Sequence, residues 1–126
     1  MKTLIVAILC VIIIICLWAF LVNYMDYSVN LLVSELNRVE DAVLDNNWEN
    51  VNKNMTDFTE LWMDYKEIYG LFVDEDLLFA IDAFQAQVEA FIFFEEQTDV
   101  LATIHTLKHE LLNIHRRELL TPRNIL

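Results

Sequence analysis

The stretch that decides the fold is LIVAILCVIIIICLWAFLV, residues 4–22, which contains no charged residue, no Pro and no Gly. As a helix rising about 1.5 Å per residue it spans roughly 28 Å, close to the bilayer's hydrocarbon thickness of about 30 Å. A core helix of a soluble domain has a polar face, and this stretch has none. We therefore predict a transmembrane helix, with the lipid bilayer as the partner of residues 4–22.

A cleaved signal peptide is the alternative to a retained anchor. Such a signal needs a shorter apolar stretch and a cleavage site of small residues, whereas this run ends in LWAFLVNYM. Trp18, Phe20, Tyr24 and Tyr27 cluster at this end, where the aromatic rings of a membrane helix favour the headgroup layer. The sequence favours an uncleaved signal anchor over residues 1–22.

The charges flanking the run predict its orientation. Lys2 precedes it, while Asp26 is the first charged residue after it and no basic residue follows until Arg38. Basic residues favour the cytoplasmic side. We expect a single-pass protein of the cell membrane, with a cytoplasmic N-terminus and an extracytoplasmic domain over residues 23–126.

The composition of residues 23–126 limits what this domain binds. It holds all 20 acidic residues and seven of the eight basic ones, a formal charge of −13. This charge argues against binding of nucleic acid or anionic lipid. Both cysteines, Cys10 and Cys16, lie in the apolar run, so the domain has no disulfide framework.

The remaining sequence predicts helices joined by short connections. Apolar residues recur at alternating steps of three and four, and the whole chain has one Gly and one Pro. The first helix is expected to run without a break from about residue 3 to 44. The helices expected within the domain cover about 23–44, 48–69, 75–95 and 98–118.

Turn signals separate these helices. DNN at residues 45–47 is the first breaker, Gly70 is a plausible C-cap, and Asp74 and Thr98 are expected N-caps. Pro122 fits a helix stop or the start of one last turn. The predicted fold is all-α: the N-terminal transmembrane helix continues into an antiparallel bundle of three to four helices. Two stacked helical hairpins are the alternative arrangement.

The third predicted helix carries two apolar stripes. Its core stripe includes Leu77 and Ile81, and Phe79 lies two residues from Leu77, about 200° around the helix. The second stripe is therefore either sandwiched in the bundle or exposed to a partner. Its members, the candidate interface residues, are Phe79, Ala83, Ala86, Ala90, Phe93 and Phe94.

No motif in the sequence indicates a metal, a cofactor or catalysis. His105 and His109 share a helix face and are weak metal candidates, but a structural zinc site needs four ligands and no HExxH or Cys pair accompanies them. The acids at 74–76 lack the spacing and Gly of a calcium-binding loop. We find no nucleophile elbow or phosphate loop and predict no enzyme.

Several stretches together resemble the bacterial domain-of-unknown-function family 4363, whose members are short membrane-anchored helical proteins. The resembling stretches are NNWENVNKNMTDFTELW, VDEDLLFAI, LATIHTLKHELLNI and the terminal NIL, within residues 45–126. Family members often read D-H-E-E-I-D where the third helix opens. Here Asp74 matches, but Glu75 replaces the His, and Leu77 and Phe79 replace acids. The resemblance implies an architecture and no activity.

Two functions are consistent with these patterns. The first is a membrane-anchored accessory or scaffold protein that acts through a protein partner or self-association. The alternative is an extracytoplasmic sensor or binding module that holds a small ligand, peptide or metal.

Overall fold

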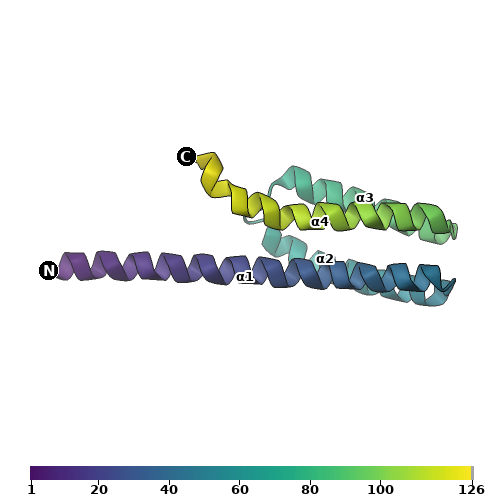
Figure 1. The fold of residues 1–126 in the computed structure, drawn as a ribbon, viewed down its shortest axis with the longest axis horizontal. Coiled ribbons are helices and arrows are strands. Elements are labelled where there is room, and N and C mark those ends of the chain that lie inside the picture. The colour runs from purple at the N-terminus through teal and green to yellow at the C-terminus, as the bar shows by residue number, and fades with distance from the viewer. Residues whose placement is uncertain (126) are drawn as a thin grey trace.

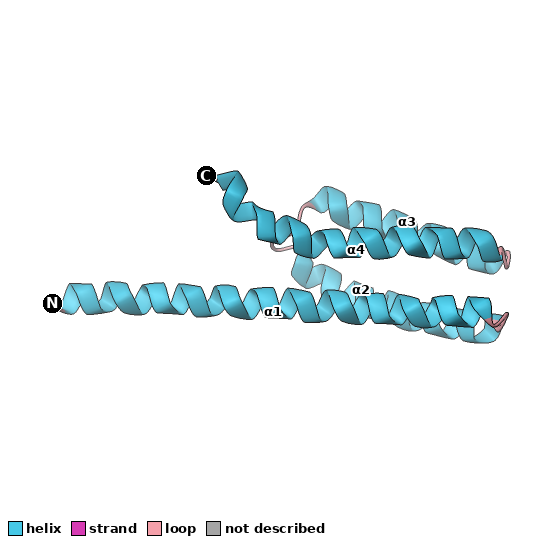
Figure 2. Ribbon diagram, in the orientation of Figure 1, coloured by secondary structure: helices cyan, strands magenta, loops and turns pink. Residues whose placement is uncertain are grey.

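A computed structural model describes the backbone of residues 1–125 and the side chains of residues 1–114. It contains four helices, α1 (Lys2–Leu44), α2 (Trp48–Tyr69), α3 (Glu75–Phe93) and α4 (Gln97–Ile125) (Figure 2). The described part of the chain has no strand. The predicted all-α fold class is confirmed.

The helices form two hairpins packed against each other. α1 pairs with α2 and α3 pairs with α4, while α1 also contacts α4 and α2 contacts α3. Figure 1 shows the two hairpin turns at the end of the molecule far from the N-terminus, and the α2–α3 connection at the opposite end of the bundle. The chain thus alternates in direction, and the predicted antiparallel bundle is confirmed with four helices.

α1 projects beyond the bundle as a single unbroken helix, as predicted. Every side chain from residue 1 to 20 is exposed, and packing begins with Leu21, which contacts the core, and Met25, which is buried. By length and composition the helix could cross a membrane near the N-terminus. The same helix therefore supplies both the apolar projection and one wall of the bundle.

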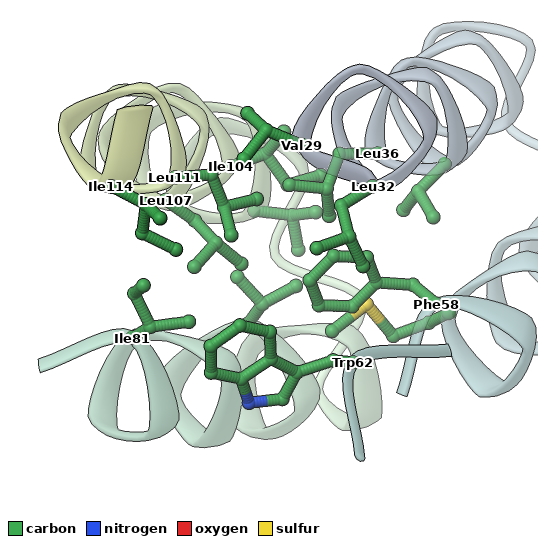
Figure 3. Packing of buried hydrophobic residues seen from close by; sticks show 14 of the residues in the cluster. Val29, Leu32, Leu36, Phe58, Trp62, Ile81, Ile104, Leu107, Leu111 and Ile114 are labelled. Atoms are coloured by element: carbon green, nitrogen blue, oxygen red, sulfur yellow. The ribbon is translucent and has the colours of Figure 1, made fainter. Parts of the chain in front are cut away.

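The apolar seams of all four helices meet in one core (Figure 3). Leu32 of α1, Trp62 of α2, Ile81 of α3 and Leu107 of α4 are each fully buried. In Figure 3 the ring of Trp62 lies below the aliphatic side chains of α1 and α4. Burying a side chain of this size stabilises a fold by about 1.5–3 kcal/mol before entropy is counted.

The turn between α1 and α2 follows the sequence signal. Asn47 is the N-cap of α2, and its side-chain oxygen accepts a hydrogen bond from the Asn50 backbone N–H at 3.2 Å. Asn46 adopts φ 56°, a left-handed conformation that Asn tolerates better than most residues. DNN therefore separates the two helices in two ways: Asn46 turns the backbone, and Asn47 caps the start of α2.

Gly70 is the C-cap of α2, as predicted, but its φ is −59°, so the left-handed freedom of Gly is not used there. Other boundaries differ from the predictions. Thr98 lies inside the first turn of α4, because that helix begins at Gln97. α3 ends at Phe93, and the helix α4 runs past Pro122 to Ile125, beyond the predicted end near residue 118.

Candidate functional site

The second apolar stripe of α3 lies on the surface of the bundle. Phe79 is 60% exposed, Phe93 79% and Phe94 68%, and the three alanines between them are exposed as well. On the opposite stripe of the same helix, Ile81 and Val88 are fully buried, while Phe84 and Phe91 are partly buried against the core. In the single chain, α3 is therefore not sandwiched. We call the surface formed by Phe79, Ala83, Ala86, Ala90, Phe93 and Phe94 the α3 face.

The α3 face is a continuous seam with aromatic ends. From Phe79 to Phe93 it extends over roughly 21 Å of helix axis. The rings of Phe93 and Phe94 meet edge to face, with centroids 5.1 Å apart. The middle of the seam carries only methyl side chains, so another helix could approach the backbone of α3 closely there.

A polar network between α2 and α3 holds this face outward. The indole Nε1 of Trp62 donates to Asp82 Oδ1 at 2.8 Å, and Lys66 Nζ donates to Asp82 Oδ2 at 2.5 Å. One carboxylate thus joins a fully buried indole to a half-exposed ammonium. Because Asp82 faces α2, the rotation of α3 about its axis is fixed.

A second polar contact lies one to two turns further along α3. Thr59 donates to Glu89 Oε1 at 3.0 Å, and Gln85 Nε2 donates to Thr59 Oγ1 at 3.0 Å. Asp82, Gln85 and Glu89, three polar residues of α3, are therefore engaged with α2. These contacts turn part of the polar surface of α3 towards α2 and leave the apolar seam exposed.

A depression of about 400 Å³ adjoins the α3 face at Phe79. Its lining residues come from the end of α2, the following loop and the start of α3: Lys66, Gly70, Val73, Glu75, Leu78 and Phe79. It is open to solvent and mixes one ammonium and one carboxylate with apolar side chains. It extends the apolar surface around Phe79 towards the α2–α3 loop.

The two weak metal candidates lie elsewhere, on α4. His105 and His109 are both exposed and line a depression of about 230 Å³ that also contains Lys108. Lys108 Nζ donates to Asn37 Oδ1 at 2.8 Å and to Glu40 Oε2 at 2.5 Å. Its ammonium charge beside the imidazoles opposes binding of a cation. Within residues 1–114 no three His, Cys, Asp or Glu side chains gather as a metal site would require.

An aromatic cluster closes the end of the bundle from which α1 projects. Tyr24 and Tyr65 pack edge to face at 5.9 Å, Tyr65 stacks on Tyr69 at 6.0 Å, and Phe72 meets Tyr69 at 6.3 Å. Tyr65 and Tyr69 follow the three–four spacing of the second helix, but that spacing does not indicate this cluster. The available signal was their position at the end of one helix, level in an antiparallel hairpin with Tyr24, which lies where the partner helix leaves the apolar run.

Burial changes the acidity of these phenols. It raises the pKa of Tyr69 well above the usual range, and a hydrogen bond with Ser28 only partly offsets the effect. Burial also raises the pKa of Tyr24 and of Tyr65, the latter with help from neighbouring acidic groups. All three tyrosines are therefore held in their neutral form in the folded protein.

Residues 19–125 match the family described as domain of unknown function DUF4363. The chain belongs to this family. No curated protein and no solved structure matches it. The DUF4363 match begins at Ala19, just before packing begins at Leu21, and so takes in the whole bundle and the α3 face. Of the two positions at which the resemblance leads us to expect acids, Leu77 is buried and Phe79 lies on the α3 face.

Proposed function

We propose that this DUF4363 protein is a single-pass membrane protein that acts by contact with another protein through the α3 face, not by catalysis. The observation that carries the proposal is the exposure of two separate apolar surfaces, residues 4–20 of α1 and the α3 face. Exposed apolar patches of this kind mark membrane and protein contacts.

The lipid bilayer is the proposed partner of the first surface. Fourteen residues of the run 4–22 are Leu, Ile, Val or Phe. Each favours insertion by roughly 0.3–0.6 kcal/mol at the membrane centre, so the total reaches at most about 4–8 kcal/mol. Lys2 before the run and the acidic flank after it favour a cytoplasmic N-terminus and an extracytoplasmic bundle.

A second copy of the chain is the proposed partner of the α3 face. From Phe79 to Phe93 the seam advances by four, three, four and three residues, the spacing of d and a positions in a coiled coil. A copy in the same membrane has its anchor parallel to the first. A two-fold axis along the membrane normal then places two α3 helices side by side in the same direction, with Ala86 opposite its counterpart.

The proposed contact is too weak to hold two copies together in solution, but it is strong enough to hold two copies that are anchored in the same membrane. The seam covers only two heptads, and alanine buries little apolar area. Anchoring both copies in one bilayer raises their effective concentration and aligns them, which adds affinity without adding contacts. Reversible association within the membrane is consistent with an accessory or scaffold protein.

Disulfide trapping in native membranes tests the proposal. In a chain carrying Cys10→Ala and Cys16→Ala, we expect Ala86→Cys to form a disulfide-linked dimer on mild oxidation. Ala102→Cys is the matched control, an exposed alanine on α4, and should stay monomeric. Adding Phe79→Asp and Phe93→Asp to the Ala86→Cys chain should abolish the dimer.

Each part of the proposal fails on a different result. Equal trapping at positions 86 and 102, or none at 86, contradicts self-association through the α3 face. Release of the full-length chain from membranes by alkaline carbonate contradicts the anchor. A reporter fused to the C-terminus that is active only in the cytoplasm contradicts the orientation.

A further inference from the structure

We infer that the α2–α3 loop rests in the lipid headgroup layer, with Leu71 as its apolar contact, so that the bundle is seated directly on the bilayer. The inference rests on the proposed anchor and adds a second membrane contact to it. Two observations support it: the position of the loop relative to the apolar run, and the exposure of Leu71 in that loop.

Two contacts fix the end of α2 at the level where α1 leaves the apolar run. Tyr24 packs on Tyr65, and Ser28 is hydrogen-bonded to Tyr69 in the core. Tyr24 lies about 3 Å of helix rise beyond residue 22. The headgroup layer on each side of a bilayer is about 5–7 Å thick. The Tyr24–Tyr65 contact therefore falls within that layer.

The loop lies at the membrane side of this contact. α2 runs towards the projecting end of α1, and residues 70–73 follow its last residue (Figure 1). In the loop, Leu71 is 83% exposed, while the neighbouring Phe72 is half-buried against Tyr69. An apolar side chain thus points away from the bundle at the depth where a bilayer would meet it.

The loop is a hydrogen-bonded turn that holds Leu71 in a defined position. The backbone N–H of Leu71 donates to the Ile68 carbonyl at 3.1 Å, and that of Phe72 donates to the Tyr69 carbonyl at 3.1 Å. The N–H of Val73 also donates to the Tyr69 carbonyl, at 2.8 Å. These bonds keep the backbone N–H groups of residues 71–73 paired, which favours entry into a layer that is poorer in water.

α1 has no break between the apolar run and the bundle that would let the bundle move away from the bilayer. Leu21, which belongs to the apolar run, already packs against the core, and α1 continues unbroken through this point. A rigid helix that carries both the anchor and a wall of the bundle holds the loop at a fixed height.

The charges beside the loop identify the kind of lipid. Asp74, Glu75 and Asp76 follow Val73 directly. Anionic headgroups would repel these carboxylates, so the loop fits a zwitterionic surface such as phosphatidylcholine.

An environment-sensitive fluorophore on residue 71 tests the contact. The full chain with Cys10→Ala, Cys16→Ala and Leu71→Cys is labelled with nitrobenzoxadiazole and reconstituted into phosphatidylcholine vesicles. We expect blue-shifted emission that nitroxide-labelled lipid quenches. Leu44→Cys is the matched control, a 57% exposed leucine at the far end of α1, and its label should remain in water and unquenched.

The remaining outcomes overturn the inference or separate it from the anchor. A label at position 71 that emits as in water, while the chain resists carbonate extraction, overturns the loop contact and leaves the anchor standing. A blue shift that fades as lipid is added at constant protein means that another copy covers Leu71, and also overturns it. Retained helicity by circular dichroism ensures that either result reports on a folded chain.

Discussion

The hydroxyl of Tyr69, in the last turn of α2, donates a hydrogen bond to Ser28 Oγ of α1 inside the core. Ser28 gives its own proton to the Met25 carbonyl at 3.0 Å, so its oxygen is the acceptor in the pair with Tyr69. Ser28 and Tyr69 are both fully buried, which strengthens their interaction and makes its loss costly. The pair locks the end of α2 to α1 where the bundle begins.

Tyr69→Phe should therefore lower the stability of the bundle without changing its fold. The substitution keeps the ring and removes one buried hydrogen bond, which contributes about 0.5–1.5 kcal/mol to the free energy of unfolding. Urea unfolding of the full chain in mild detergent, followed by circular dichroism, measures the change. Tyr27→Phe is the control, because Tyr27 is 66% exposed. Equal effects of the two substitutions would refute this role for the Ser28–Tyr69 bond.

Alkaline pH should destabilise the bundle through the same tyrosines. Burial raises the pKa of Tyr69, Tyr65 and Tyr24 in the folded state, whereas an unfolded tyrosine titrates near about pH 10. The unfolded chain thus loses phenolic protons first, so stability is retained below about pH 10 and falls as pH rises above it. Unfolding free energies measured across this range should fall less steeply for Tyr69→Phe than for the unmodified chain. An identical slope would show that Tyr69 does not contribute.

Asp82→Ala should destabilise the contact between the two hairpins. It leaves the buried Nε1 of Trp62 without the acceptor at 2.8 Å and removes the partner of Lys66. An unpaired buried donor costs about 1–3 kcal/mol of unfolding free energy. Asp82→Asn keeps an oxygen for the indole and should cost less, and Asp57→Ala, at an exposed position of α2, should cost little. Near-ultraviolet circular dichroism of Trp62 would report its altered surroundings; an unchanged signal and stability would contradict the assigned role of Asp82.

The sequence determined the helices and their buried seams because three–four periodicity is a local property. Leu32, Trp62 and Leu107 each lie on this three–four spacing, and all three are fully buried. The Ser28–Tyr69 and Trp62–Asp82 bonds could not be predicted, because each depends on the rotation and axial register of one helix against another. The exposure of the α3 face could not be predicted for the same reason: spacing shows that α3 is apolar on two sides, and only packing decides which side has a neighbour.

The two apolar stripes of α3 should differ sharply in their effect on stability. Phe93 is 79% exposed and Ile81 is fully buried, although both are large apolar residues of one helix. Ile81→Ala removes core packing and should cost about 2–5 kcal/mol of unfolding free energy. Phe93→Ser should stay within about 0.5 kcal/mol of the unmodified chain, because exposed positions contribute little to folding. Both variants are compared in dilute detergent, where the copies are separated and only folding is measured. If Phe93→Ser unfolds the bundle as Ile81→Ala does, the α3 face belongs to the core, and the surface proposed for self-association does not exist.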